Sequence, residues 1–437
     1  MRSFCTSGLA LSLGLLWSAG AMAQGYGSPS LLPMPEAGPQ LSTSPASYSA
    51  ALANSPYRST LSNHQPALAD DGRLPPPPGQ DNMRSGAMAS ADSGEGSPCG
   101  NWSDDCCGDC CCGPTWFVSS NALILNRDTP NRFWTTFETN NNPNQLMNTK
   151  DADADWAGGA EIRVGRWCCP DCSGRSGWEV VYYGIKLDGF ASLRDPGNDL
   201  STPINLDTQT GPFLIGARPA ADFFDSAREH RIFRDNEIHN IEVNFLRETL
   251  ISNQSTQVTW LAGFRYFRFD ESVIFGSVAG DAAITPGGAE FGNNGGVDEA
   301  YLDIRCENNL VGFQVGARGD YYCTDDVSLF LAPKLGVYGN EINSRSRLYT
   351  GSGISAFDIE SNEDDFSFLA QVDLGASYQF APHWRLFGGY RAIAVSGIAL
   401  ADNQFPAFIA AADEFADIDT NGDLILHGAF LGLELNY

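Results

Sequence analysis

Apolar and polar residues alternate along ten segments of the chain, each of about ten residues or more. In segment 366–380, Phe366, Phe368 and every second residue after them are apolar, whereas the residues between them are mostly polar or small. Such alternation is typical of a β-strand with one apolar and one polar face. The predicted strands are 116–126, 158–167, 177–189, 238–251, 257–269, 299–321, 327–339, 366–380, 384–395 and 425–437.

The connections between these strands alternate between short and long along the chain. The short ones are 168–176, 252–256, 322–326 and 381–383, and the long ones are 127–157, 190–237, 270–298, 340–365 and 396–424. Short turns at one end and long loops at the other are typical of outer-membrane barrels. We therefore predict an all-β fold: a transmembrane antiparallel up-and-down β-barrel with both chain ends on the short-turn side.

One segment does not fit a simple strand. Along 299–321 the apolar face changes from Leu302 and Ile304 to Val311 and Phe313. We expect one long strand with a β-bulge, which inserts one residue and shifts the alternation. A hairpin turn at residues 307–309 is the alternative, and it would raise the count from ten strands to eleven or twelve.

Aromatic residues gather next to the strand ends that we assign to the periplasm, as expected of a girdle at a membrane interface. They are Trp116, Trp167, Trp178, Trp260, Tyr321, Tyr378, Trp384 and Tyr437. We expect Tyr437, the last residue, to act as a C-terminal assembly signal. The predicted partners are accordingly outer-membrane lipid and the barrel-assembly machinery.

The N-terminal quarter has a different composition. Residues 1–23 resemble a secretory signal peptide, with Arg2 before a short apolar run and Ala21-Met-Ala23 as a cleavage site. Residues 24–98 are rich in Pro, Ser, Ala and Gly and predict a disordered tether. A Cys-rich segment, 99–115, precedes the barrel at 116–437. We expect an integral protein of the outer membrane of a double-membraned bacterium, with its N-terminal segment in the periplasm.

The chain is strongly acidic, with 26 Lys and Arg residues against 53 Asp and Glu residues and a net charge of −27. Binding to a phosphate backbone depends on Lys and Arg, so this balance argues against nucleic acid as a partner. It is compatible with small solutes or cations near acidic surface loops.

Twelve cysteines in an exported chain favour disulfides, with thiolate metal binding as the alternative. The candidates are Cys106, Cys107, Cys110, Cys111, Cys112, Cys168, Cys169 and Cys172.

The only cofactor that the sequence suggests is Ca²⁺. Residues 417–423 match the first half of a calcium loop, but the bidentate Glu of such a loop is missing, since the twelfth position is Gly428. The candidate ligands are Asp417, Asp419, Asn421 and Asp423. The alternative is a solvated acidic turn before the last strand.

Charged residues on the polar strand faces predict contacts inside the barrel. If Phe380 pairs with Trp384 across the 381–383 turn, Asp373 stands opposite Arg391, and Gln379 opposite Arg385. Side chains nearly fill small barrels, so a structural ion pair is favoured over a charged constriction that selects ions. The predicted lumen charges are Asp373, Arg391, Arg385, Arg318 and Lys334.

The sequence predicts no catalytic residue. His230 lies near Asp225 and Glu229 in the longest predicted loop. One His among loop acids is more often a solvated cluster than a hydrolytic site, because a catalytic assignment needs geometry as well as a motif.

Two stretches resemble a known family. Residues 116–128, Trp-Phe-Val-Ser-Ser-Asn-Ala-Leu-Ile-Leu-Asn-Arg-Asp, resemble the first strand of the putative beta-barrel porin family, the seventh of that naming series. Residues 308–320 together with 334–336 resemble its central strand pair. The resemblance covers about residues 116–437 and implies an outer-membrane β-barrel, with no substrate or catalytic residue attached.

Three functions remain open at this point. The first is a porin-like passive channel or structural envelope protein with acidic surface loops. The second is a non-conducting barrel whose loops bind cations or a surface layer. The third is a barrel with a hydrolytic site at its outer loops.

Overall fold

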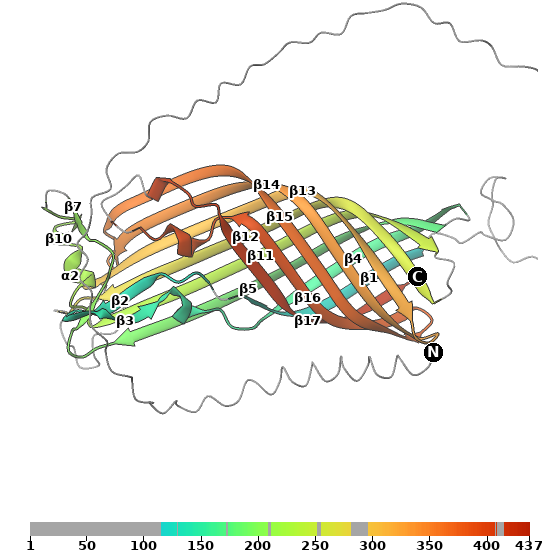
Figure 1. Ribbon diagram of the computed structural model, residues 1–437, viewed down its shortest axis with the longest axis horizontal. Helices are drawn as coiled ribbons and strands as arrows, with labels where there is room; N and C mark the ends of the chain where they lie inside the picture. The colour runs from blue at the N-terminus through green and yellow to red at the C-terminus, as the bar shows by residue number, and fades with distance from the viewer. Residues whose placement is uncertain are drawn as a thin grey trace, which may run out of the picture. The chain divides into compact units, whose positions relative to one another are not determined.

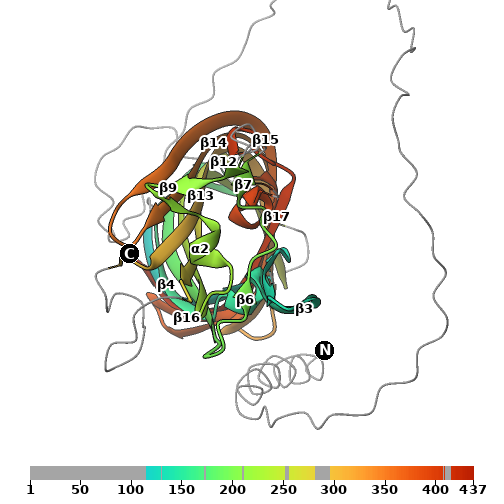
Figure 2. The same ribbon diagram turned by 90° about the vertical axis from the view of Figure 1, so that its left-hand side faces the viewer.

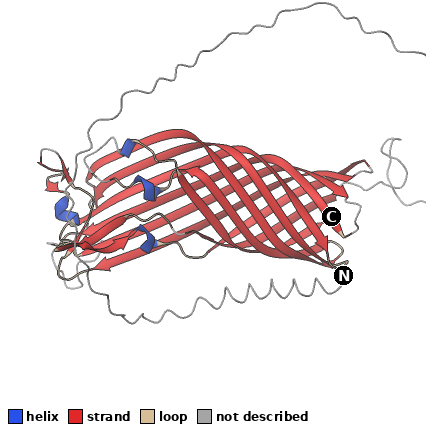
Figure 3. Ribbon diagram, in the orientation of Figure 1, coloured by secondary structure: helices blue, strands red, loops and turns tan. Residues whose placement is uncertain are grey.

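The computed structural model describes residues 115–437 apart from 129, 172–173, 209–210, 251–254, 281–295, 407 and 409–414. Ten long antiparallel strands of this part close into a barrel (Figures 1 and 3). They are β1 (Thr115–Arg127), β4 (Ala157–Asp171), β5 (Gly174–Arg194), β11 (Glu229–Leu250), β12 (Thr256–Val278), β13 (Glu299–Tyr322), β14 (Val327–Thr350), β15 (Ser355–Ala381), β16 (Trp384–Ile398) and β17 (Gly422–Asn436). The predicted all-β, up-and-down barrel of ten strands is confirmed.

The barrel closes where its first and last strands meet. β1 pairs with β17 from Phe117 opposite Asn436 to Arg127 opposite Leu426, and every other pair joins neighbours along the barrel order. Closure leaves no strand edge exposed to lipid. Both chain ends of the barrel and the short β4–β5, β11–β12, β13–β14 and β15–β16 connections lie together, and we call this end the turn end. The opposite end, which carries the long connections and the short β14–β15 connection, is the loop end.

The barrel wall has two heights. β1, β4, β16 and β17 have 13 to 15 residues, whereas β5 and β11 to β15 have 21 to 27. β14 and β15 continue far beyond their predicted ends and are joined by residues 351–354. The predicted long loop at 340–365 is therefore wrong, because most of it is strand.

The tall strands reverse their polarity along their length. On β13, Val311 and Phe313 face outward near the turn end, while nearer the loop end the outward side chains are charged. There the inward face carries buried Leu302, Ile304 and Cys306. The register of β13 with β12 and with β14 has no shift. The predicted β-bulge is therefore wrong: the apolar residues change sides because the strand leaves the apolar band and enters water.

Connections at the loop end lie across the opening of the barrel (Figure 2). One connection carries β2 (Trp134–Glu138), β3 (Asn141–Asn148) and the 3₁₀ helix η1 (Thr149–Ala152). The connection after β5 carries α2 (Ala221–Phe224) and five two-residue strands, β6 (Leu200–Ser201), β7 (Asp207–Thr208), β8 (Gly211–Pro212), β9 (Leu214–Ile215) and β10 (Arg218–Pro219). The connection after β16 carries the 3₁₀ helix η2 (Ala401–Gln404).

Most of the predicted aromatic girdle faces outward at the turn end. Exposed side chains of this group are Trp178, Trp260, Tyr321, Tyr378, Trp384 and Tyr437. Trp167 instead faces the lumen, where its ring packs against Phe117. No helix among the described residues is long and apolar enough to span a membrane.

The reversal of polarity makes a prediction about β15, on which Val372 and Asn362 face the same side. Val372 lies in the middle of the apolar run Phe366–Phe380, and Asn362 lies beyond it. Val372→Arg should lower the free energy of unfolding by about 2–4 kcal/mol, because it places a charge in the bilayer centre. Asn362→Arg should change it by less than about 0.5 kcal/mol. Urea unfolding in phospholipid vesicles measures both; equal losses would contradict the proposed membrane boundary.

Candidate functional site: the lumen

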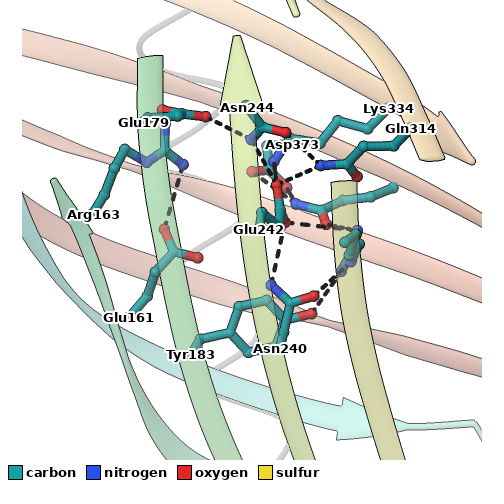
Figure 4. Close-up of polar contacts among 12 residues, drawn as sticks. Glu161, Arg163, Glu179, Tyr183, Asn240, Glu242, Asn244, Gln314, Lys334 and Asp373 are labelled. Carbon is teal, nitrogen blue, oxygen red and sulfur yellow. Dashed lines mark hydrogen bonds and ion pairs between the residues drawn. The ribbon is translucent and has the colours of Figure 1, made fainter. Parts of the chain in front are cut away.

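A layer of polar side chains crosses the lumen in the half of the barrel nearer the turn end, and we call it the charge belt (Figure 4). Each member faces inward because it alternates with the apolar residues of the outer face. The members are Asn121, Glu161, Arg163, Glu179, Tyr183, Asn240, Glu242, Asn244, Arg265, Gln314, Lys334, Gln371, Asp373 and Arg391.

Arg391 connects two sides of the charge belt. Its Nε and Nη2 each donate to a carboxylate oxygen of Asp373 on the neighbouring strand at 2.9 Å. Its Nη1 forms an ion pair with Glu161 on β4, which is separated from β16 by β17 and β1. The guanidinium is therefore shared by two buried carboxylates, and it lies in the space that a pore would need.

Glu242 holds the opposite side of the charge belt. Lys334 Nζ and Gln314 Nε2 both donate to its Oε2 at 2.8 Å, although Lys334 lies three strands away. Arg265 Nη1 donates to Gln371 Oε1 at 3.1 Å, and its Nη2 donates to the Tyr183 hydroxyl at 3.0 Å. These contacts span the lumen, so the side chains bind each other where water would otherwise pass.

An apolar ring lies next to the charge belt on the side of the loop end. Its side chains come from β1, β5, β11, β12, β13, β15, β16 and β17. Leu400 of the β16–β17 connection packs among them. The ring consists of Leu123, Leu125, Ile185, Leu187, Ile238, Phe267, Phe269, Leu310, Leu369, Ile393, Val395, Leu424 and Leu426. A filled apolar layer excludes water from the centre of the barrel.

Residues 399–406, which we call the plug segment, lie inside the barrel beyond this ring. Asp402 binds the Arg234 guanidinium through Oδ1 at 2.6 Å, and Ala401 N donates to Glu271 Oε2 at 2.9 Å. Asn308 binds Ala399 through both its donor and its acceptor, each at 2.8 Å. Backbone and side-chain contacts to three wall strands therefore hold the plug segment in place.

A second apolar cluster closes the loop end, and we call it the outer core. It combines wall residues such as Val273 and Phe275 with Phe223 and Phe224 of α2. Along the inner face of β12 all the layers appear in order: Arg265, then Phe267 and Phe269, then Glu271, then Val273 and Phe275. The lumen is therefore closed by successive polar and apolar layers.

The turn end opens into a vestibule of about 330 Å³ that ends at the charge belt. Ion pairs lie at the mouth of the vestibule, and each joins two neighbouring strands or two residues of one strand. These are Arg175–Glu248 at 2.7 Å, Arg318–Asp320 at 2.9 Å and Arg385–Glu434 at 3.5 Å.

All five lumen charges expected from the sequence line this vestibule. Asp373 pairs with Arg391 and Gln379 with Arg385 in the strand register, but at the turn Ala381, not Phe380, pairs with Trp384. The predicted turn pairing is wrong by one residue, and a local irregularity absorbs the shift. Sequence reasoning missed Glu161, Glu242 and Arg265, since their partners lie on strands that become close only when the barrel closes.

The candidate calcium ligands do not converge. Asp419 Oδ1 accepts hydrogen bonds from both the backbone and the side chain of Asn421, at 2.9 and 3.1 Å, so it organises a turn. Asp417 and Asp423 are exposed. No group of three or more His, Cys, Asp or Glu side chains in the described part of the chain could hold a metal. The calcium hypothesis stays a prediction without geometric support here.

Of the disulfide candidates, Cys168 is described, and its exposed thiol is free, so that assignment is wrong. Cys306 is also free and is buried in the outer core, whereas Cys323, in the β13–β14 turn, is disulfide-bonded. Cys106, Cys107, Cys110, Cys111, Cys112 and Cys172 lie outside the described residues, as does the Cys169 side chain.

His230, the candidate of the hydrolytic hypothesis, is the second residue of β11 and is fully buried. Its Nδ1 shares a hydrogen bond of 2.8 Å with the Thr136 hydroxyl, and its Nε2 shares one of 3.1 Å with the Phe224 carbonyl. The ring therefore joins two loop connections to the wall, and the predicted solvated position in a loop is wrong.

Comparison with known families follows the limits of the barrel. The sequence pattern of the family described as Putative beta barrel porin-7 matches residues 120–437. The chain belongs to this family. The resemblance seen in the sequence is thereby confirmed, and the chain is an outer-membrane β-barrel protein. No curated protein matches it.

Several solved outer-membrane proteins are similar to the chain at low identity. The outer membrane protease OmpT from Escherichia coli is 10% identical, with 74% of this chain and 97% of that chain covered and a TM-score of 0.33. A Pseudomonas aeruginosa FadL homologue is 9% identical over 74% and 90%, with a TM-score of 0.29. A major outer membrane protein from Thermus thermophilus is 10% identical over 74% and 100%, with a TM-score of 0.27. At such scores these likenesses carry no argument about function.

Arg391 tests the charge belt. Arg391→Met should lower the free energy of unfolding by about 3–5 kcal/mol, because it leaves Asp373 buried without its ion-pair partner and Glu161 with Arg163 alone, at 3.5 Å. Arg385→Met removes the same charge from the open mouth and should cost less than about 1 kcal/mol. Urea titration in phospholipid vesicles, followed by heat-modifiable migration, measures both. Similar losses of unfolding free energy in the two variants would show that the buried Arg391 stabilises the barrel no more than the exposed Arg385 does.

Asp402 gives the plug segment a pH dependence. Burial and the negative charge of Glu271 raise the pKa of Asp402 to about 6. The positive charges of Arg234 and Arg127 oppose this shift but do not cancel it. A carboxyl with a raised pKa binds its proton more tightly in the docked state, so docking is strongest below its ordinary pKa of about 4 and weakens as the pH rises through 6.

Hydrogen exchange of the amides of residues 399–406, corrected for the intrinsic effect of pH, should therefore show more protection at pH 5 than at pH 8. Asp402→Asn should remove this difference. Greater protection at pH 8 in the unmodified protein would reverse the assigned sign.

Proposed function

We propose that the protein is a closed, non-conducting barrel that anchors its N-terminal segment to the outer membrane, with the turn end in the periplasm. The observation that supports this most is the filled lumen. A charge belt, an apolar ring, the plug segment and the outer core follow one another with no described cavity passing through them. An open passive pore would need a continuous polar path, as in wider barrels.

The position of the chain ends supports the anchoring role. Trp116 and Tyr437 exchange backbone hydrogen bonds at the turn end, at 2.8 and 2.9 Å. The long segment before Thr115 therefore leaves the barrel at this end. Because that segment carries the predicted tether and the Cys-rich stretch, the barrel would fix them at the periplasmic face of the membrane.

The loop end would provide the contact with the outside. On the outward face beyond the apolar band, exposed carboxylates include Asp235, Glu341 and Asp364. Such a solvated acidic surface attracts cations and could connect to a surface layer through them.

A second candidate function, a gated channel, depends on the plug segment. Residues 399–406 belong to a connection rather than to the wall, and polar contacts to Arg234, Glu271 and Asn308 hold them. A movable segment in the lumen is the usual structural requirement for gating. The charge belt would still have to open, which makes this candidate the weaker one.

Planar-bilayer recordings with the purified full-length protein test the proposal. We expect no stepwise conductance in concentrated KCl between pH 5 and pH 8, because the charge belt and the apolar ring remain closed in this range. A known porin, recorded in the same membranes, provides the positive control.

A silent recording counts only if the protein has inserted, so flotation with vesicles and heat-modifiable migration must be shown for the same sample. Reproducible ohmic steps at every pH would overturn the closed barrel in favour of a pore. Steps confined to the higher pH values, together with loss of plug protection, would favour the gated channel.

A further inference from the structure

The apolar band on the outside of the barrel carries very little charge. Among the described strands, the outward residues between the turn-end aromatic residues and the polar loop half are apolar, small or uncharged, with two exceptions. Both exceptions are arginines, Arg166 on β4 and Arg247 on β11, and both lie at the turn end. In a chain of net charge −27, acidic residues would be expected more often than basic ones at any exposed site. On the outward strand faces at this rim, the charged side chains that the structure describes are therefore both positive, and the nearby exposed carboxylates, Asp325 and Asp326, belong to the β13–β14 turn.

Arg166 lies between two tryptophans. Trp116 of β1 and Trp178 of β5 are its direct partners in the strand register. Its guanidinium carbon lies 5.3 Å from the centre of the Trp116 ring. The rings of Trp116 and Trp178 meet edge to face, with their centres 5.7 Å apart. The two indoles therefore fix the guanidinium at the level of the interface.

No carboxylate in the described residues forms an ion pair with Arg166. The other cations at this end are differently placed, since Arg175, Arg318 and Arg385 face the vestibule and have acidic partners. A guanidinium at the edge of a low-dielectric band is costly unless an anion neutralises it. The anion for Arg166 has to come from outside the described chain.

Arg247 lies on the other side of β5 and extends the same rim. It stands opposite Ser176 of β5 and Trp260 of β12, and its Nη1 donates to the Ser176 hydroxyl at 2.7 Å. Two guanidinium groups and three indoles thus surround the end of β5. Tryptophan favours the headgroup level of a bilayer, and arginine matches the oxygens of a phosphate.

From this arrangement we infer that Trp116, Arg166 and Trp178 form a binding site for the phosphate of an anionic phospholipid in the leaflet at the turn end. One or two phosphate oxygens accept from the Arg166 guanidinium, and the glycerol region lies against the indoles. The inference depends on the proposed orientation in one respect only, namely that it identifies this leaflet as the periplasmic one.

Native mass spectrometry of the full-length protein, released from nanodiscs with equal amounts of phosphatidylglycerol and phosphatidylcholine, tests the site. The unmodified protein should retain phosphatidylglycerol in preference to phosphatidylcholine. Arg166→Gln should lower this preference about fivefold, the effect expected for one basic residue at a lipid surface. Arg166→Lys keeps the charge and should keep most of the preference.

Arg345→Gln is the matched control. Arg345 is also exposed on the outward face, but it lies beyond the apolar band and pairs with Asp358 through Nη2 at 2.6 Å. This variant should retain the preference of the unmodified protein. All variants should show heat-modifiable migration. Because Arg166→Lys preserves the positive charge beside Trp116, it keeps the test valid if Arg166→Gln assembles poorly.

Equal retention of the two lipids by the unmodified protein would overturn the inference. So would a loss of preference of the same size in Arg166→Gln and Arg345→Gln, since that would show a general effect of charge. A nanodisc presents the same lipids to both ends of the barrel. The result therefore does not depend on which end faces the periplasm or on whether the barrel conducts. The lipid test and the conductance test can accordingly fail independently of each other.

Discussion

The buried charges of the lumen have to neutralise one another, because the closed wall and the packed layers keep them out of bulk water except at the inner end of the vestibule. Arg391 meets this requirement by binding Asp373 on the next strand and Glu161 across the lumen. Each contact also fixes the distance between two parts of the wall. A ten-strand barrel is narrow enough for such contacts, and once they form, the lumen has no room for a water column. One set of ion pairs thus both sets the distance between parts of the wall and blocks the lumen.

The wall must at the same time suit two environments. Near the turn end, the outside is apolar and the inside polar; nearer the loop end the arrangement is reversed, with charged residues outside and Leu302, Phe275 and Phe223 inside. The loop half therefore has the polarity of a water-soluble β-barrel, built on the same strands that cross the bilayer. Loops fill its short side because an apolar inner face cannot remain open to water. The plug segment and α2 complete this core and at the same time obstruct the lumen.

Strand positions and strand faces could be predicted from the sequence, since alternation is local and the ten segments carry it plainly. The contact between Asp373 and Arg391 also followed from local information, because a short turn sets the register of its hairpin. The irregularity at Ala381 and Trp384 did not spread into the strands. The prediction missed the strand extensions between residues 340 and 365 and the regular register of β13. A strand that leaves the membrane loses its apolar outer face, and its sequence then resembles that of a charged loop. Contacts such as Lys334 with Glu242 depend on strands brought together by closure, and no periodic signal marks them.

The distribution of charge is more informative than its sum. Inside the membrane half, the charges are paired, so they contribute little to any field at the surface. On the outward face of the loop half, carboxylates exceed their partners and account for part of the net charge of −27. At the turn end, the charged side chains on the outward faces of the described strands are Arg166 and Arg247, although the chain has about twice as many acidic as basic residues. A surface that is acidic toward the outside and basic at one rim of the apolar band interacts with different species at its two ends. In the proposed closed anchor, this asymmetry would hold the barrel at a defined depth and direction in the membrane.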